Sequence, residues 1–386
     1  MTRILFFQFG DFADAFHRFE RGEAETYRDQ RTSVAKVVSL SERYAVDVVV
    51  CGHREHQEQL LPNLRCWVSP ESRFWQRQAV RDLMQSIPEP DLFVCRTPNR
   101  VMLDWAASRQ IRTLGMFADT FEPVSPRVHL ANWRLASVLK RLPYPAIANH
   151  GRPAAESLQF LGIPPEKRIA WDFNPLSPQK PPAGKMAANT PFRLFYAGAL
   201  LESKGVGDII QAVAELRKSG VDVQANLAGK GENERFQRLI DELQVSDAVR
   251  LLGLIPLTEI VPQMRAHDAT VVGTHHCYAE GLPNTIFEAL SAATPLIVSD
   301  HPVFTKVLKP NHDALFFPEK NVASLASAVR SLISDPSLYR TLMEAGEKTL
   351  ATLYNGVTFD NLLDSFLEDP AGSNGWPARF ALKPVP

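Results

Sequence analysis

The sequence predicts an α/β protein with two doubly wound, Rossmann-like parallel-sheet domains. Three observations support this fold class. The 386 residues exceed one ordinary domain, since a domain takes about 100–200 residues. Short runs rich in Val, Ile and Phe alternate with helical patterns in both halves of the chain. A proline-rich stretch between the halves has little apolar periodicity, as is typical of a linker.

The first half contains five apolar runs that predict buried strands, with helical patterns between them. The strands are expected at residues 4–9, 46–52, 91–97, 111–118 and 146–150, and two of the helices at 26–44 and 98–109. Strand and helix alternate, which favours a parallel sheet with crossover helices.

The pattern begins again after the proline-rich stretch. Strands are expected at residues 192–198, 221–229, 249–253, 269–274 and 295–300. The helix expected at 204–219 has one apolar face made of Val206, Ile209, Ile210, Val213 and Leu216. We therefore predict one domain over residues 1–175, a linker over 176–191 and a second domain over 192–353. Residues 354–386 read as a helix and an irregular tail, with packing back onto the first domain left open.

Composition excludes several classes of partner. The net charge is −1 and charged residues make up 22 %, so no basic field favours nucleic acid. Cys51, Cys66, Cys95 and Cys277 lie far apart without metal-ligand spacing, which favours reduced thiols and a cytoplasmic protein. No uncharged apolar run reaches the roughly 18 residues that span a bilayer. Any membrane contact is thus expected to be peripheral, at the inner membrane surface.

Residues 127–142 are the segment on which such a contact would depend. They hold four basic residues and no acid, and Ala131, Leu135, Val138, Leu139 and Leu142 share one helical face. Such a helix either lies on an anionic membrane surface or packs its apolar face into the protein core, with its basic side chains in solvent. We favour the core interpretation.

Glycines and lysines follow the strands of the second half, where parallel sheets bind ligands. Gly198 ends one strand, and Lys204 and Gly205 open the next helix, an arrangement that suits phosphate. Gly229 and Gly231 follow the next strand. Each group alone is also compatible with an ordinary turn or a surface lysine.

The stretch from Glu280 to Glu288 gives a sharper signal. Gly281 and Leu282 bring backbone N–H groups to the mouth of a predicted helix. A carboxylate such as Glu280 near a helix start is expected for stability alone. Glu288 lies deeper in an otherwise apolar helix, where a carboxylate needs a partner such as the vicinal hydroxyls of a ribose.

These motifs together resemble a known family. The "GALLESKG", "LAGKGE" and "EGLPNTIFE" segments, in this order, make residues from about 192 to 335 similar to the donor-binding half of family 4 retaining glycosyltransferases, which have the GT-B fold of two Rossmann-like domains facing across a cleft. The N-terminal half matches this family more loosely.

The resemblance implies a role for each motif residue. Glu288 would bind the ribose hydroxyls of a nucleoside diphosphate sugar, and Glu280 would hold the donor sugar or stabilise developing charge. Lys204 would neutralise the diphosphate, and the backbone of Gly281 and Leu282 would position sugar and phosphate. The donor is a substrate, so neither a cofactor nor a metal is implied.

The first half supplies weaker candidates for the acceptor side. Asp119 stands where the resemblance places an acceptor-side histidine or acid, and an N-cap or turn aspartate is the alternative. Arg28 and Arg31 lie near a helix start and would reach phosphate, although we favour exposed residues without a specific role. His150 follows a strand and faces the cleft or a turn, and the turn is favoured.

Departures from the family pattern concern phosphate binding. Ala199 stands where the family usually has an arginine after the first-strand glycine. Loss of one preorganised donor costs about 3–4 kcal/mol in a transition state. His301 lies in "SDHPVF", which replaces the family's usual glycine pair, and its role is undecided.

Ligand-type side chains also gather in "THHCYAE", which holds His275, His276 and Cys277 before Glu280. Adjacent side chains on an extended chain point to opposite sides, so convergence on zinc is disfavoured.

The sequence therefore predicts a retaining, metal-independent glycosyltransferase that uses a nucleotide-sugar donor and a hydroxyl acceptor, which is a sugar, a lipid-linked sugar or a small molecule. Its products would be polysaccharides, glycolipids or other glycoconjugates. The alternatives are a GT-B nucleotide-sugar epimerase or hydrolase, and a non-catalytic nucleotide-sugar-binding protein.

Overall fold

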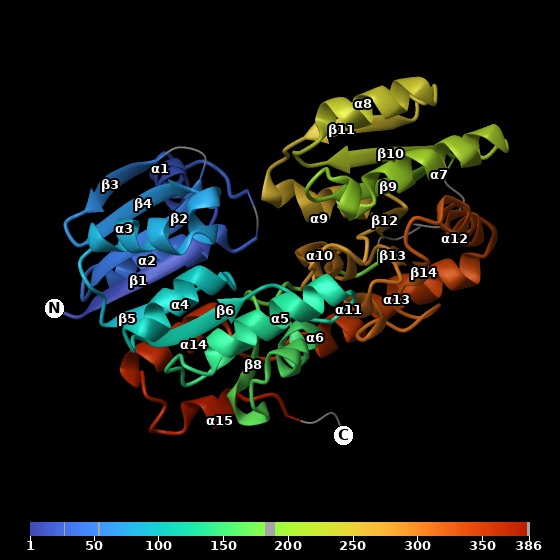
Figure 1. The fold of residues 1–386 in the computed structure, drawn as a ribbon. Coiled ribbons are helices and arrows are strands. Elements are labelled where there is room, and N and C mark those ends of the chain that lie inside the picture. The colour runs from blue at the N-terminus through green and yellow to red at the C-terminus, as the bar shows by residue number, and fades with distance from the viewer. Residues whose placement is uncertain (27, 53–54, 182–189, 384–386) are drawn as a thin grey trace. The chain divides into compact units, whose positions relative to one another are not determined.

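The computed structural model describes residues 1–26, 28–52, 55–181 and 190–383. The chain divides into two compact units, each with its own sheet (Figure 1). Unit 1 combines residues 1–174 with 355–386, and unit 2 covers 175–354. Of the linker predicted at 176–191, residues 182–189 lie outside the described residues.

Unit 1 contains an eight-stranded sheet in the order β3-β4-β2-β1-β5-β6-β7-β8. Its strands are β1 Arg3–Phe9, β2 Ala45–Gly52, β3 His56–Leu61, β4 Leu64–Pro70, β5 Leu92–Cys95, β6 Arg112–Phe117, β7 Ile147–His150 and β8 Arg168–Trp171. All neighbours are parallel except β3 and β4. The parallel sheet expected from the five apolar runs is therefore confirmed, and β3, β4 and β8 are added to it, of which β3 is the antiparallel edge strand.

Helices cover both faces of this sheet. One apolar cluster joins the strands to α1 Phe12–Glu20, α2 Gln30–Leu40, α14 Phe359–Glu368 and α15 Trp376–Phe380. A second joins their other side to α3 Arg77–Gln85, α4 Arg100–Ser108 and α5 Pro126–Leu139. The short helix α6 Arg152–Ser157 lies between β7 and β8. Except for the edge strand β3, both faces of the strands are largely buried, which explains their nearly continuous apolar sequences.

Two expectations for unit 1 were wrong. The helix predicted at 26–44 begins only at Gln30, because Asp29 has the left-handed φ of 60° and interrupts the helical path. The tail is not wholly irregular, since α15 follows α14 and Trp376 is fully buried against the unit 1 sheet. Trp376 thus anchors the tail to unit 1.

Unit 2 contains a six-stranded sheet in the order β11-β10-β9-β12-β13-β14. Its strands are β9 Phe192–Ala197, β10 Val223–Ala228, β11 Val249–Gly253, β12 Ala269–Val272, β13 Leu296–Ser299 and β14 Leu315–Phe317, all parallel. This order, 3-2-1-4-5-6 in sequence terms, is that of a doubly wound dinucleotide-type sheet. Its order reverses between β9 and β12, so ligands are expected beyond the carboxyl ends of these two strands.

Seven helices complete the described part of unit 2. They are α7 Val206–Lys218, α8 Asn233–Glu242, α9 Leu257–Ala266, α10 Asn284–Ser291, α11 Pro302–Thr305, α12 Val322–Ser334 and α13 Pro336–Leu353. Helices α7 and α12 pack side by side on one face of the sheet, and α9 and α10 belong to the apolar cluster of the other face.

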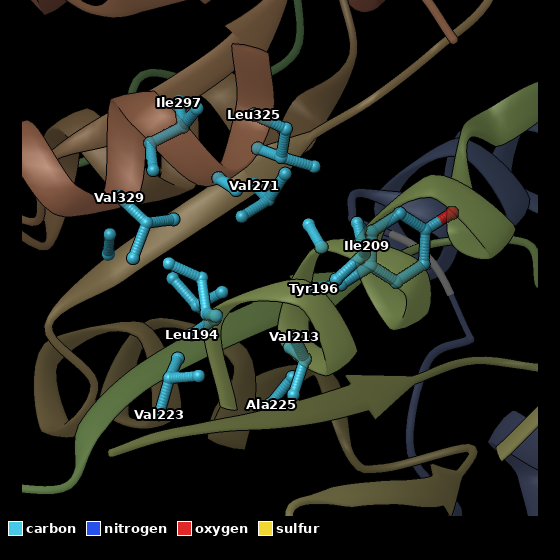
Figure 2. Packing of buried hydrophobic residues seen from close by; sticks show 14 of the residues in the cluster. Leu194, Tyr196, Ile209, Val213, Val223, Ala225, Val271, Ile297, Leu325 and Val329 are labelled. Carbon is cyan, nitrogen blue, oxygen red and sulfur yellow. The ribbon is translucent and has the colours of Figure 1, made fainter. Parts of the chain in front are cut away.

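The packing beneath α7 shows why the helix forms there. Figure 2 shows Ile209 of α7 beside Tyr196 and Val213 of α7 beside Ala225, two residues of the sheet. All five residues of the predicted apolar face of α7 are fully buried. Each such side chain contributes about 1.5–3 kcal/mol on burial, so this face fixes α7 over the sheet. The helix begins at Val206 instead of Lys204, because Gly205 takes a left-handed φ of 72°.

Candidate functional site

The loops after β9 and β12 meet at the point where the strand order reverses. Gly205, which precedes α7, lies against the backbone of Gly273, which follows β12. A Cβ at position 205 would come within 2.2 Å of the Gly273 carbonyl oxygen, so only glycine permits this approach. The contact holds the Lys204 segment beside the loop that contains Glu280.

The loop after β10 joins the same group. Leu200 N–H donates to the carbonyl of Lys230 at 3.0 Å, and Glu232 N–H donates to the carbonyl of Leu200 at 2.7 Å. A Cβ at Gly229 would lie 1.7 Å from the Gly198 carbonyl oxygen. The structure therefore brings Gly198, Gly229 and Gly231 together. The close approach of backbone at Gly229 and Gly231 by itself requires glycine there, without any ligand.

Lys204 and Glu280 form an ion pair between these loops. The Lys204 Nζ contacts Glu280 Oε2, and it lies 4.0 Å from the centre of the Tyr278 ring. Thr274 Oγ1 donates to the same carboxylate oxygen at 3.1 Å. The lysine side chain is 14 % exposed and the glutamate side chain 11 %, so a cation and a carboxylate are held nearly out of water. The two residues predicted to contact the donor are thus neighbours.

Helix α10 presents donors at its N-terminus. Gly281 and Leu282 are buried just before it, and within the described residues no hydrogen-bond acceptor faces their N–H groups. The side-chain oxygen of Asn284, the first helical residue, is also buried without a partner among the described residues. Thr285 Oγ1 donates to the carbonyl of Ala197 at 3.1 Å and ties α10 to the end of β9. The helix start is thus fixed beside β9 with polar groups still available to a ligand.

Glu288 is the second carboxylate of the motif. It is 6 % exposed and lies in α10 between side chains that pack into the apolar cluster, among them Phe287 and Leu290. Glu280 lies on the loop before α10, so the two carboxylates come from different local structures. Glu288 lies inside the helix and Glu280 before it, as the sequence predicted, and their ligand roles stay predictions.

The residues between β12 and Glu280 fix the loop. His275 Nε2 and Asp208 Oδ2 of α7 lie 2.8 Å apart, and both side chains are buried. His276 Nε2 lies 2.9 Å from Asp300 Oδ1, which follows β13. The two histidine side chains therefore go to different elements. Sequence reasoning missed the role of Asp208, since an acid in the first turn of a helix is expected for stability alone.

His301 has a local structural role. Its Nδ1 accepts from Val303 N–H at 3.3 Å as the cap of α11, and its Nε2 donates to the carbonyl of Tyr278 at 3.2 Å. Burial lowers the pKa of His301, partly offset by the bond to Tyr278. A neutral ring protonated on Nε2 satisfies both contacts. His301 thus supports the loop through Tyr278.

Ala199, at the position where the resemblance implies an arginine, contributes a backbone contact to the turn after β9. Its carbonyl oxygen accepts from the hydroxyl of Tyr196 at 2.7 Å. Burial, with a further contribution from the Glu280 charge, raises the pKa of Tyr196. The tyrosine stays protonated as a donor, which fixes the turn between β9 and Lys204.

Arg28 and His150, two of the candidates in unit 1, both lie beside the ring of Phe173. Asp119 follows β6, and its carbonyl accepts from Asn149 Nδ2 at 2.7 Å. The N-cap of α5 is Ser125, so the N-cap interpretation of Asp119 was wrong. Arg28 is buried and donates to the carbonyl of Asn174, which corrects its assignment as an exposed helix residue. Arg31 is exposed on α2 as expected. His150 is buried at the end of β7 and is not a turn histidine.

Comparison with known proteins bears on the same region. Residues 182–349 match the family model of glycosyl transferases group 1. Unit 2 is thus similar to this family over most of its length. The matched range contains the residues of the site described above in unit 2.

Curated relatives match part of the chain. The chain is 29 % identical over 181 residues to glycogen synthase of Mycobacterium tuberculosis, covering 46 % of this chain and 42 % of the relative. It is 30 % identical over 217 residues to the lipopolysaccharide core biosynthesis glycosyltransferase LpsD of Rhizobium meliloti, covering 55 % and 60 %. The chain thus spans about half the length of the curated relatives it matches.

Solved structures resemble nearly the full length of the chain. Sucrose-phosphate synthase from Thermosynechococcus elongatus has a TM-score of 0.65 at 15 % identity, covering 95 % of this chain and 98 % of that one. Anabaena HepE, solved in complex with UDP, has a TM-score of 0.64 at 14 % identity, covering 95 % and 99 %. These likenesses show the GT-B fold, as the sequence predicted.

Proposed function

We propose that the protein transfers a sugar from a nucleoside diphosphate sugar to a hydroxyl acceptor in glycan synthesis. The observation that carries the proposal is the pairing of Lys204 with Glu280 beside the N-terminus of α10. A cation and a helix N-terminus together attract a diphosphate, and a carboxylate next to them accepts from sugar hydroxyls. Structures of Anabaena HepE with UDP and with UDP-glucose support a donor of this class.

We propose that the residues around α10 contact different parts of the donor. Lys204 exchanges part of its contact with Glu280 for the donor phosphates, and the N–H groups of Gly281 and Leu282 donate to phosphate or sugar oxygens. Glu280 then turns its carboxylate to the sugar hydroxyls. Glu288, buried inside the helix, accepts from the ribose hydroxyls. We propose that the reaction needs no metal and no cofactor, because Lys204 and the helix N-terminus neutralise the diphosphate.

We propose retention at the anomeric carbon. The bond between the anomeric carbon and the diphosphate oxygen breaks, and the acceptor oxygen bonds to the same face. The acceptor proton passes to the leaving phosphate oxygen, so no protein base is required. This step explains why the two carboxylates bind the donor and neither attacks it. A role for Asp119 on the acceptor side and a cytoplasmic location stay predictions.

A thermal-shift screen of the purified protein tests the proposal. UDP, GDP, ADP and dTDP and their sugars are compared with EDTA present, since a ligand that binds only the folded state raises the melting temperature. One nucleotide series should give a selective shift that Glu288→Ala removes. Glu280→Ala should keep most of the shift and lose turnover. NMR of the product formed by the wild type should show the donor's anomeric configuration. An inverted product contradicts retention, and no shift with any nucleotide contradicts donor binding.

A further inference from the structure

Helix α5 of unit 1 has a buried side and an unusual exposed side. Leu135, Val138 and Leu139 pack into the unit 1 core, as the core interpretation of this segment predicted. Ala131, which was expected on the same face, is exposed. The helix is thus anchored to the sheet by one side, and its opposite side faces outward.

Large apolar side chains lie on that outward side. Trp133 is 65 % exposed and Leu130 is 45 % exposed, and the two are three residues apart, which makes them neighbours on one helix face. Val124, just before the helix, is 50 % exposed. A lone exposed apolar residue needs no explanation, but an exposed indole next to an exposed leucine indicates an interaction surface.

Cations flank this apolar stripe. Arg127 and Arg134 are three and four residues from Leu130, and Lys140 is seven residues from Trp133, so all three lie on the same side of α5. All three are exposed, and in the described part of the chain none of them forms an ion pair. Arg141, by contrast, is paired with Asp104 of α4.

The charge of the surrounding sequence has one sign. No Asp or Glu occurs between Glu122 and Glu156, whereas five Lys and Arg residues do. Glu156 itself pairs with Arg152. The net charge of the whole chain is only −1, so this segment is a local concentration of positive charge and does not reflect overall composition.

We infer that the outward side of α5, made of Arg127, Leu130, Trp133, Arg134 and, at its end, Lys140, binds an anionic lipid surface. Tryptophan is enriched at the boundary between lipid and water, where its ring is buried and its N–H stays solvated. An apolar stripe between unpaired cations matches a helix that lies in the plane of the interface. This inference is independent of the sugar-transfer proposal, because its residues belong to unit 1 and the donor residues to unit 2.

Vesicle flotation of the full chain tests the inference. The protein should float with phosphatidylcholine vesicles that contain phosphatidylglycerol, and added salt should release it. Arg127→Gln combined with Arg134→Gln and Lys140→Gln should lower the partition coefficient about a hundredfold, at about 1 kcal/mol for each cation. Trp133→Ser should lower it about tenfold. These side chains are exposed, so the variants should keep the wild-type circular dichroism spectrum.

Trp75→Ser is the matched control, because Trp75 is 61 % exposed in the same unit but lies outside the α5 surface. It should bind vesicles like the wild type. An equal loss in Trp75→Ser and Trp133→Ser would overturn the assignment of the surface. Equal flotation with and without phosphatidylglycerol would overturn the role of the cations. A dimer that dissociates in Trp133→Ser, together with no vesicle binding, would identify a second copy of the chain as the partner instead.

Discussion

His150 makes the acid stability of unit 1 predictable. It ends β7, it is 5 % exposed, and its ring centre lies 5.1 Å from that of Trp171 and 4.9 Å from that of Phe173. Burial lowers the pKa of His150 to about 3, and the charge of Arg28 adds to the effect. In the unfolded chain a histidine titrates near 6.5. The unfolded state therefore binds the proton between these two values and the folded state does not.

The sign and size of the effect follow from linkage. A histidine whose folded pKa is depressed loses its stabilising contribution as the pH falls below the unfolded pKa. Between pH 7 and pH 4.5 this loss is about 2.5 kcal/mol. His150→Phe keeps an aromatic ring beside Trp171 and Phe173 but takes up no proton. We expect the free energy of unfolding of this variant to fall by about 2.5 kcal/mol less than that of the wild type over the same range.

Urea unfolding followed by tryptophan fluorescence measures this difference in unit 1 alone. All six tryptophans of the chain lie in unit 1, and residues 175–354 contain none. His150→Gln serves as a second variant if phenylalanine does not fit. His129→Phe, at an exposed position of α5, is the control and should follow the wild type. The same pH dependence in wild type and both His150 variants would refute the reasoning.

Three further predictions concern a buried acid, a glycine and the site lysine. Burial raises the pKa of Asp172 to about 6, so ionisation destabilises the fold as the pH rises from about 4 to about 6. Between pH 4.5 and pH 7 the free energy of unfolding of the wild type should therefore fall by about 2 kcal/mol relative to that of Asp172→Asn, measured by the same urea titration. Gly205→Ala should destabilise unit 2 by about 2 kcal/mol or more, seen in thermal melts by circular dichroism, because the added Cβ meets the Gly273 carbonyl. Lys204→Gln should weaken nucleoside diphosphate binding about 10- to 100-fold and leave nucleoside binding unchanged, measured by calorimetry.

Each of these has its own contradicting result. An Asp172→Asn difference that does not change with pH would show that the carboxyl is not the titrating group. Gly220 has a similar φ of +84° and open space around its Cβ, so Gly220→Ala should cost about 1 kcal/mol or less. A Gly205→Ala cost no larger than that would contradict the close approach of the two loops. Equal weakening of nucleoside and diphosphate binding in Lys204→Gln would contradict a phosphate contact.

The parts of the site that the sequence predicted are those that topology determines. Lys204 and Glu280 lie 76 residues apart, but both follow strands that end at the same edge of a parallel sheet. The glycines were identifiable for the same reason. Glu288 was identifiable because a carboxylate interrupts an apolar helix.

Other features depend on contacts that no local pattern encodes. Arg28 looks like a surface residue in sequence, yet its acceptor is the carbonyl of Asn174, 146 residues away. The buried pair of His275 and Asp208 joins residues 67 positions apart. Strand β3 was missed because its sequence, HQEQLL, is mostly polar, and only pairing with β4 makes it a strand. Tertiary contacts override local preference at each of these positions.

Isothermal titration calorimetry of nucleoside diphosphates tests donor binding most directly. UDP, GDP, ADP and dTDP are each titrated into wild type, Glu288→Gln and Glu344→Gln, with EDTA present. Glu344 lies on α13 of the same unit and outside the site, so its variant is the charge-matched control. One nucleotide should bind wild type and Glu344→Gln equally and bind Glu288→Gln at least about tenfold more weakly, since hydrogen bonds to a charged group contribute about 1.5–3 kcal/mol. No binding of any nucleotide, or equal binding by all three proteins, would contradict a donor site at α10.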